Sequence, residues 1–528
     1  MQTKTNPALP EFPKSKNLLA CLIVGVVLTL LYFFAAWNLD INVADEGYYW
    51  YGAQRILHGE VPILDFMAYD PGRYYIGALV MQVDGSDGIW AARLAAYLVL
   101  GLLVSLGIYL ALLSFQGTRK AQILYSAVVA LILIIWSYPI FRTFDFLAGV
   151  LLIFAVSIFL RHRSLRGWFF AGLILGLVAV LGRNHGVYGV FGHLVALAII
   201  YLDRESVKPT APAYFSWVLG VFVGYLPIIF LAVFVDGFAQ AFYESIKFIL
   251  ESSATNISLP VPWPWTVDIG KIGLVWSAIF MMKGLFFIGL LAFSIIGLGY
   301  VALARKSGWS LMSGEAGTSV FLASICLALP YAQYAFSRAD IEHLAPSLLP
   351  FIFGMLSIPI ARKSKARILV GVLLIFSGLI VMLGTQPALR YFVLHDQLEA
   401  YAIGQDEILI PPYQATRLRG FDRLIEDEKL KGGSFLALPN FPTVHAIHSS
   451  KMPIWEIYSL FNRPKLFEEK EIARMEKNKP SLVILSNHAL DQNEALRYSH
   501  MHPVIYRWLN THYRKESLEN NIEIYRRK

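Results

Sequence analysis

Long runs of apolar residues, separated by short polar segments, occupy roughly the first three quarters of the chain. A helix that crosses a bilayer needs about 20 apolar residues. The runs predict about eleven spans, at residues 17–38, 88–114, 121–140, 145–160, 167–182, 186–202, 213–235, 283–303, 317–334, 344–361 and 368–386. Two further apolar stretches, 73–83 and 272–282, fit a re-entrant segment, an interfacial helix or an extension of a neighbouring span.

The pattern changes after residue 386, where charged residues of both signs alternate with short apolar segments. Continuous apolar segments predict buried strands at 432–441 and 480–487, and amphipathic periodicity predicts helices at 466–478 and 504–516. The predicted fold is therefore an α-helical polytopic membrane domain, residues 1–386, followed by a small α/β domain, residues 387–528. The membrane domain includes a long first outer loop at 39–87.

The composition agrees with this class. Hydrophobic residues make up 56% of the chain and charged residues only 16%, whereas a soluble domain carries roughly 25% charged residues. The net charge of +8 comes largely from Lys and Arg in short loops, so no nucleic-acid partner is indicated. Both cysteines, Cys21 and Cys326, fall inside apolar runs, which favours small buried side chains over a disulfide.

The positions of Lys and Arg also predict the orientation, because these residues accumulate in short cytoplasmic loops. If the N-terminus is cytoplasmic, the inside loops contain Arg119, Lys120, Arg161, Arg163, Arg166, Arg204, Lys208, Arg305, Lys306, Arg362, Lys363, Lys365 and Arg367. The short outside loops mostly hold a single Arg each. An odd number of spans then places residues 387–528 on the extracytoplasmic side of the inner or plasma membrane.

The first outer loop carries candidate chemistry. Asp45 and Glu46 follow the first span, where a carboxylate pair is costly unless it is solvated, paired or used. A solvated helix N-terminus is the plainer alternative. The segment from Glu46 to Gly59 is predicted to be an interfacial helix with Tyr and Trp at headgroup depth. Arg73 and Tyr74 follow a Pro-Gly break.

The other outside loops are short and also charged. They contribute Asp145 in "FRTFDF", Arg183 and His185 in "GRNHGVYG", and Arg338, Asp340 and His343 in "FSRADIEHL". Each alone fits a snorkelling side chain or a local salt bridge. Together they indicate a site at the outer membrane surface.

The residue types suggest roles in this site. A guanidinium fork suits a phosphate, so the donor-phosphate candidates are Arg73, Arg183 and Arg338. Candidate substrate-binding residues are Tyr74, His185, Asp340 and His343. An Asp suits a base that takes a proton from an acceptor hydroxyl. An apolar groove between spans could hold a lipid tail.

The Asp45-Glu46 pair after the first span, the amphipathic stretch and "PGRYY" resemble the GT-C glycosyltransferase superfamily. The nearest branch is the protein O-mannosyltransferase and aminoarabinose-transferase type. The resemblance implies a polyprenyl-phosphate or dolichyl-phosphate sugar donor, inverting transfer to an acceptor hydroxyl on the outer face, and Asp45 as the base. It also implies a supporting role for Glu46, and Asp145 stands where relatives often carry another acidic residue.

Cofactors and competing functions stay open at this stage. Some relatives contain a divalent metal, but no His and Glu set has ligand spacing here; His185, His343 and Glu342 would form one only if folding joined them. A lipid or glycan transporter or flippase is one alternative, although the ionisable residues gather at one boundary rather than at the midplane. A non-catalytic scaffold is another. The segment 236–282 fits a lid or an interfacial Trp anchor, and neither sugar nor acceptor can be read.

Overall fold

The computed structural model describes residues 15–161, 164–203, 206–252, 257–307, 316–359, 364–519 and 521–528. By contacts the chain divides into two compact units. The bundle unit contains the described residues up to Ala36, Ala96–Ala239 and Tyr243–Leu394. The α/β unit contains Trp37–Ala95, Gln240–Phe242 and His395–Lys528. Four of the basic loop residues considered above, Arg163, Arg204, Arg362 and Lys363, lie outside the described residues.

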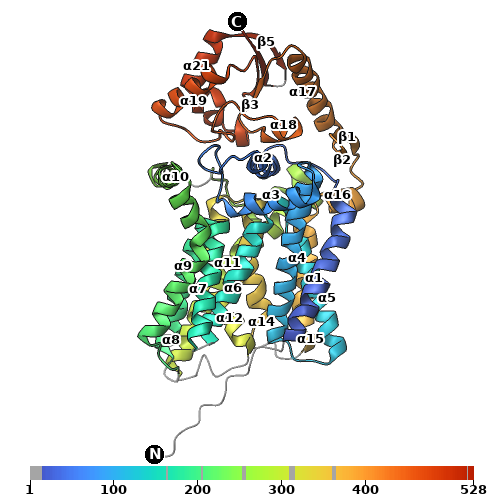
Figure 1. Ribbon diagram of the computed structural model, residues 1–528. Helices are drawn as coiled ribbons and strands as arrows, with labels where there is room; N and C mark the ends of the chain where they lie inside the picture. Colours follow the sequence, from blue (N-terminus) through green and yellow to red (C-terminus); the bar gives the residue numbers. More distant parts are fainter. Residues whose placement is uncertain are drawn as a thin grey trace, which may run out of the picture. The chain divides into compact units, whose positions relative to one another are not determined.

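The bundle unit is almost entirely helical (Figure 1). Its elements are α1 (Ser15–Ala36), α4 (Ile89–Ser114, whose first turns belong to the α/β unit), α5 (Arg119–Trp136), α6 (Thr143–Arg161), α7 (Leu165–Leu181), α8 (Arg183–Leu202), α9 (Ala211–Phe234), α10 (Phe238–Ser252, of which Gln240–Phe242 belong to the α/β unit), α11 (Ile269–Lys306), α12 (Ala316–Ser337), α13 (Ile341–Ser347), α14 (Leu349–Ser357), α15 (Ser364–Met382) and α16 (Pro387–Val393).

Nine of the eleven predicted spans are confirmed among the described residues. Among the described residues, nine helices are long and apolar enough to cross a membrane, and two shorter apolar segments, Leu165–Leu181 and Ile341–Ser357, occupy the remaining predicted positions. The chain is therefore a multi-pass membrane protein. Burial separates the inner helices from the outer ones: 89% of the apolar core of α6 is buried, against 17% for α9. The exposed apolar side chains of α9 are the surface expected to face lipid.

The two ambiguous apolar stretches have different outcomes. Residues 272–282 form part of the long helix α11 and therefore extend a span. Residues 73–83 form a separate helix, α3 (Gly72–Asp84), in the α/β unit. One face of α3 is buried, while Tyr75, Leu79 and Val83 are exposed at four-residue spacing. This amphipathic pattern is typical of an interfacial helix rather than of a span.

Helices α7 and α9 pack through small residues. Gly172 and Gly176 on α7 face Gly220 and Gly224 on α9, so each helix carries a GxxxG pair at the contact. A methyl group on any of these glycines would overlap a backbone carbonyl oxygen of the other helix. Because lipid provides no hydrophobic force between helices, such close backbone approach is a main source of their association.

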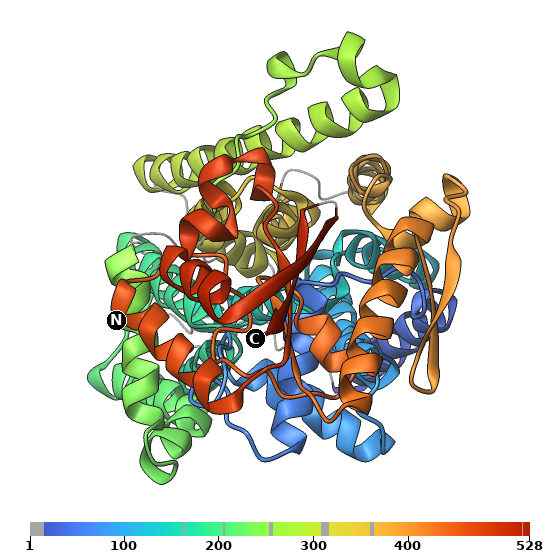
Figure 2. The same cartoon turned by 90° about the horizontal axis from the view of Figure 1, so that it is seen from above.

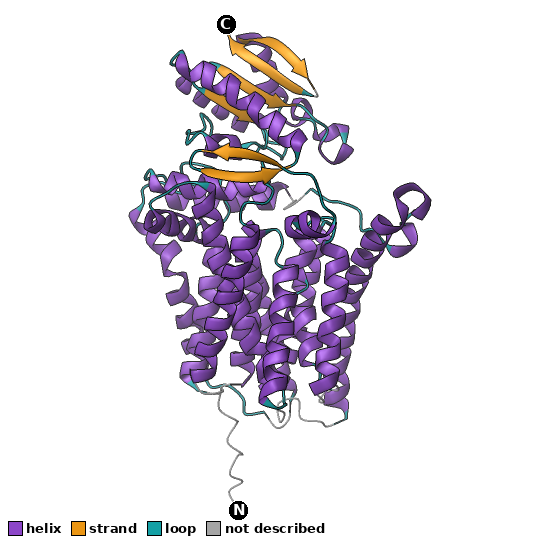
Figure 3. Cartoon of the chain, turned by 90° about the vertical axis from the view of Figure 1, so that its right-hand side faces the viewer, coloured by secondary structure: helices purple, strands orange, loops and turns teal. Residues whose placement is uncertain are grey.

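The α/β unit consists of helices α2 (Asp45–Leu57), α3, α17 (Pro412–Leu430), α18 (Pro442–Ile447), α19 (Lys465–Asn478), α20 (Tyr498–Met501) and α21 (Pro503–His512), and strands β1 (Glu399–Ile403), β2 (Asp406–Ile410), β3 (Phe435–Leu438), β4 (Leu482–Ser486), β5 (Tyr513–Glu519) and β6 (Ile522–Arg527). The strands form a hairpin, β1-β2, and a separate sheet in the order β3-β4-β6-β5 (Figure 3). Among the paired strands of the described residues, only β3 and β4 run parallel.

The predicted strands and the helix at 466–478 are confirmed as β3, β4 and α19. The helix predicted at 504–516 is wrong at its end, because α21 stops at His512 and the next residues belong to β5. Pairing with β6 decides this boundary: Tyr513 lies opposite Arg527, and its hydroxyl donates to the carbonyl of Pro480 at 2.7 Å. The helix α17 packs beside the hairpin, as Figure 2 shows in orange.

The first outer loop packs with the C-terminal residues inside the α/β unit. Helix α2 approaches α18 so closely that a methyl group on Gly47 would overlap Thr443. The amide of Gln54 donates to the carbonyl of Ala446 at 3.1 Å. The predicted helix after Asp45 is confirmed as α2, and its Tyr and Trp side chains are buried within the protein. Their depth relative to the lipid headgroups stays a prediction.

Replacing Gly224 by Ala should destabilise the bundle by about 1–3 kcal/mol, because the added methyl group forces α7 and α9 apart. Thermal unfolding of the purified protein in detergent measures the effect. Gly299→Ala is the matched control, since a methyl group there meets no atom within 4 Å. Equal melting temperatures for the two variants would contradict the packing argument.

Candidate active site

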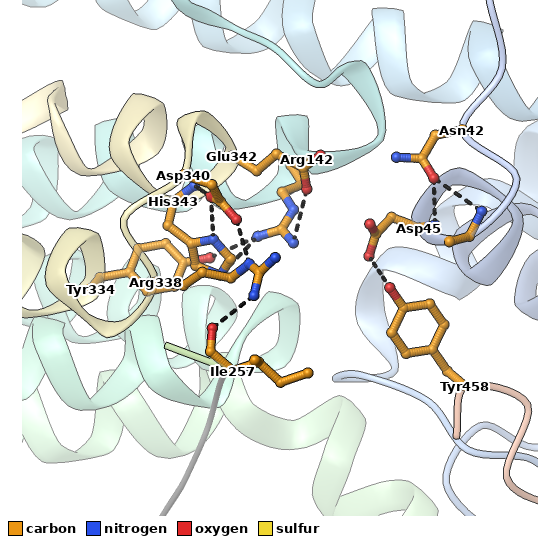
Figure 4. Close-up of polar contacts among 11 residues, drawn as sticks. Asn42, Asp45, Arg142, Ile257, Tyr334, Arg338, Asp340, Glu342, His343 and Tyr458 are labelled. Carbon is orange, nitrogen blue, oxygen red and sulfur yellow. Dashed lines mark hydrogen bonds and ion pairs between the residues drawn. The ribbon is translucent and has the colours of Figure 1, made fainter. Parts of the chain in front are cut away.

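Asp45 stands at the start of α2, where the chain is fixed by a local cap. The side-chain oxygen of Asn42 accepts hydrogen bonds from the backbone N–H of Ala44 at 3.0 Å and of Asp45 at 2.9 Å. This satisfies N–H groups that a helix start otherwise leaves free. The Asp45 side chain is half-buried, and its Oδ1 accepts a hydrogen bond from the Tyr458 hydroxyl at 3.1 Å (Figure 4).

Glu46 is buried and forms a two-pronged ion pair with Arg93 of α4 (2.7 Å and 2.8 Å). Glu46 Oε2 also accepts from the backbone N–H of Asn42 at 3.2 Å. The same guanidinium donates to the carbonyls of Trp37 and Asp40, which precede α2. A fork of this kind fixes geometry because its donors lie in one plane. Glu46 therefore orients the segment that carries Asp45.

Arg73 and Tyr74 lie at the start of α3, in the same unit as Asp45. Arg73 is 7% exposed, and its guanidinium lies 5.3 Å from the centre of the Tyr69 ring. Tyr74 is fully buried, and its hydroxyl accepts from the backbone N–H of Tyr69 at 3.1 Å. Tyr74 thus packs in the interior, whereas Tyr69 is the exposed ring of this group, at 43%.

A cluster of two arginines, two carboxylates and a histidine forms at the end of the bundle unit, and we call it the arginine cluster: Arg142, Arg338, Asp340, Glu342 and His343 (Figure 4). Arg142 ends a short 3-10 turn before α6. The others come from the α12–α13 connection and the first turn of α13.

Hydrogen bonds link the arginine cluster in a chain. Arg338 donates to Asp340 at 2.6 Å, and His343 Nδ1 donates to the other oxygen of that carboxylate at 2.7 Å. The opposite nitrogen, Nε2, is therefore free to accept from Arg142, which lies 3.5 Å away. Arg142 also pairs with Glu342 at 3.3 Å. The side chains of both arginines are mostly buried, so their charges act in a partly desolvated setting.

Asp340 is the anion on which the arginine cluster depends. Its burial alone raises the pKa, but the hydrogen bond from His343 and the charge of Arg142 outweigh burial and lower the pKa to about 2. Asp340 also caps α13 by accepting from the backbone N–H of His343 at 2.9 Å. Lys283 of α11 is close enough to interact electrostatically with Asp340. The Asp340 carboxylate thus interacts with the positive charges of Arg338, Arg142 and Lys283.

Asp145 and His185 meet in the interior of the bundle unit. His185 Nε2 lies 3.3 Å from Asp145 Oδ1, and its Nδ1 lies 3.0 Å from the Tyr331 hydroxyl. His185 is fully buried and Asp145 is 5% exposed. Arg183 begins α8 and donates to the Ser245 hydroxyl of α10 at 2.7 Å.

The structure therefore brings together some of the candidates and not others. Arg338, Asp340 and His343 form part of one cluster, and Asp145 contacts His185. Arg73 belongs to the α/β unit, whereas Arg183 and Arg338 belong to the bundle unit. In the described part of the chain, no group of three or more His, Cys, Asp or Glu residues could hold a metal ion. His185 and His343 bind separate carboxylates instead.

Three residues of these clusters were not singled out as site residues from the sequence. Arg93 carried a signal, since a lone charge inside an apolar run marks a buried partner. Arg142 was visible as a loop charge without an assigned role. Tyr458 carried no signal, because its partner lies 413 residues away in the sequence.

No protein-family model matches the chain, and no curated protein matches it. Among solved structures, the chain is similar to ArnT from Cupriavidus metallidurans, with 14% identity and a TM-score of 0.47 over 96% of this chain and 98% of that one. It is also similar to an oligosaccharyltransferase from Archaeoglobus fulgidus, with 11% identity and a TM-score of 0.41 over 94% and 72% of the two chains. Neither likeness is strong enough to assign the chain to a family.

Replacing Glu46 by Gln should destabilise the protein by about 3 kcal/mol or more, because it leaves the buried Arg93 charge without its partner. Glutamine keeps the shape and an acceptor for Asn42. Melting temperatures in detergent give the comparison. Glu251→Gln breaks an exposed pair with Lys247 and should change stability by less than about 1 kcal/mol.

The low pKa of Asp340 predicts a pH dependence of stability. The folded-state pKa of about 2 lies below the ordinary 3.8, so folding favours the ionised carboxylate. Its contribution, about 2 kcal/mol, is complete above roughly pH 5 and is lost as the pH falls toward 2. The stability difference between wild type and Asp340→Asn should therefore shrink between pH 6 and pH 3 in thermal melts. A constant difference would contradict the assignment.

Proposed function

We propose that this protein is a membrane glycosyltransferase that moves a sugar from a polyprenyl-phosphate donor to an acceptor hydroxyl, with inversion. The reaction takes place on the extracytoplasmic face of the inner or plasma membrane. In this proposal the N-terminus is cytoplasmic, residues 1–386 are the catalytic membrane domain, and residues 387–528 are extracytoplasmic. The resemblance of the Asp45-Glu46 segment and "PGRYY" to the GT-C superfamily supports the reaction type.

The observation that carries the proposal is the arginine cluster. The mostly buried side chains of Arg142 and Arg338 place two positive charges at one end of the bundle. Each guanidinium is already paired with a carboxylate. Guanidinium forks match the oxygen geometry of a phosphate. A donor phosphate that binds here would share or replace the carboxylate contacts. Arg183, at the start of α8, and Arg73, at the start of α3 in the α/β unit, stay as separate candidates for binding a donor phosphate.

Asp45 is the proposed base. Its carboxylate is half-buried and stands at a helix start fixed by Asn42 and by the Glu46–Arg93 pair. Fixed orientation matters, since a general base acts only within hydrogen-bond reach of the proton that it removes. Glu46, being ion-paired in the interior, is proposed to position Asp45 rather than to exchange protons.

The proposed chemistry has one displacement step. The acceptor oxygen attacks the anomeric carbon as Asp45 takes its proton, and the bond from that carbon to the phosphate oxygen breaks on the opposite side. The guanidinium groups stabilise the negative charge that grows on the leaving phosphate. A phosphate leaves without a general acid, so no further acid is assigned. Asp145 was predicted to be catalytic and His185 to bind substrate. Because they contact each other and Tyr331 in the interior, we propose instead that they join α6, α8 and α12.

Asp45→Asn should lower transfer by roughly 10²–10⁴-fold, because it keeps the size of the side chain and removes its basicity. The assay follows glycoside formation by purified protein with a labelled polyprenyl-phosphate sugar, chosen by mass spectrometry of the lipids that copurify. Binding of that donor should be unchanged in the variant. Wild-type rates in Asp45→Asn would exclude the proposed base.

The same preparation separates the enzyme from a lipid or glycan transporter. Proteoliposomes that contain the protein are loaded with the labelled donor. An acceptor is then added to the outside solution. Formation of a glycosidic bond that depends on Asp45 supports the transferase. Movement of intact donor across the bilayer without bond formation would instead establish a flippase.

A further inference from the structure

A segment of the C-terminal residues reaches into the surroundings of Asp45. Residues 452–463 connect α18 with α19 and contain no helix or strand, and we call them the strap. An irregular segment has no helix or sheet to pair its backbone, so its buried N–H and C=O groups need other partners. The strap is fixed on two sides, by the first outer loop and by the interior of the C-terminal residues, all within the α/β unit.

Hydrogen bonds join the strap to the first outer loop. The backbone N–H of Met67 donates to the carbonyl of Trp455 at 2.8 Å, and the Trp455 indole N–H donates to the carbonyl of Ile63 at 3.0 Å. The backbone N–H of Met452 donates to the hydroxyl of Tyr51 on α2 at 2.9 Å. These bonds set the position of the strap beside α2.

Buried carboxylates hold the strap from the other side. Glu471 of α19 accepts from the backbone N–H of Trp455 at 2.9 Å. Glu456 pairs with Arg463 inside the strap, and the side chains of both are at most 5% exposed. Burial raises the pKa of Glu456 to about 7, against the opposing charge of Arg463. A buried pair of this kind is costly to break and cannot shift freely.

Tyr458 lies between these two anchored ends. Its ring packs against the buried ring of Tyr48 on α2, with centroids 5.3 Å apart. Its hydroxyl donates to Asp45 Oδ1 at 3.1 Å. Among the described residues, the other carboxylate oxygen, Oδ2, has no hydrogen-bond partner. One oxygen of Asp45 is therefore held, and the other is available to a ligand.

We propose that Tyr458 is a positioning residue for Asp45, supplied by the C-terminal residues, and this rests on the proposed function. The hydroxyl fixes the rotamer of the carboxylate so that Oδ2 faces the acceptor hydroxyl and takes its proton. The C-terminal domain then completes the catalytic site rather than serving only as an attachment. The strap holds Tyr458 in position for this role, because its backbone is hydrogen-bonded to side chains of both α2 and α19.

Tyr458→Phe tests the proposal, since it removes only the hydroxyl. We expect roughly ten-fold or greater loss of kcat, as for a hydrogen bond to a charged group, with the KM for the donor unchanged. A hydroxyl that donates to a carboxylate favours its ionised form, so the acid limb of the pH–rate profile should move to higher pH. A merely structural role would not move that limb.

Tyr401→Phe is the matched control. Tyr401 is also a buried tyrosine of the α/β unit that donates to a carboxylate, that of Asp422 at 2.7 Å, but it lies in the β1-β2 hairpin. This variant should keep the wild-type kcat and pH profile. Trp455→Phe provides a second test of the strap, because it removes the indole bond to Ile63 and should lower kcat with the same unchanged donor KM.

A double-mutant cycle separates this inference from the proposed function. In the Asp45→Asn background, Tyr458→Phe should have no further effect, because the two side chains act as a unit. Wild-type kcat and pH profile in Tyr458→Phe, alongside an inactive Asp45→Asn, would overturn the role of Tyr458 and leave the transferase standing. Full activity in Asp45→Asn would instead exclude Asp45 as the base, which is the part of the proposed function on which this inference rests.

Discussion

The geometry around the candidate base depends on one buried ion pair, that of Glu46 and Arg93. Arg93 gathers the carboxylate of Glu46 and the carbonyls of Trp37 and Asp40 around one guanidinium. It thereby joins the chain that leaves α1, the first turn of α2 and the start of α4. Because two buried charges are costly to desolvate, the pair contributes little net stability, although breaking it is destabilising. Its main consequence is the fixed arrangement of the three segments that it joins. Because Asp45 directly precedes Glu46 in the sequence, the ion pair of Glu46 also fixes the position of Asp45.

The charged residues of the bundle follow a common rule of membrane proteins. The charges of the arginine cluster, together with Asp145 and Arg183, lie at or near helix ends, where they pair with other polar groups. In the arginine cluster, a carboxylate organises the cations: Asp340 binds Arg338 and His343 directly and reaches Arg142 through the imidazole. In the proposed function, a donor phosphate would meet cations that are already in position, so little reorganisation would accompany its binding.

The sequence was sufficient to predict the nine helices that are long and apolar enough to cross the membrane among the described residues, because each spanning helix must be apolar along its own length. Even the short apolar segments that became α7 and α13–α14 were found in this way. The end of α21 was predicted wrongly, since pairing of Tyr513 with β6 is a long-range interaction. The partners of the site residues were the hardest to predict. Arg93 was visible as an isolated charge, but the contact of Tyr458 with Asp45 arises only when distant segments fold together.

The contact between α7 and α9 also limits how a lipid could move. With backbone against backbone at Gly172, Gly176, Gly220 and Gly224, these two helices leave no room for an acyl or prenyl chain to pass between them. This wall is closed to sideways diffusion from the bilayer. In the proposed function, the hydrocarbon tail of the donor would therefore have to enter the bundle through a different pair of helices.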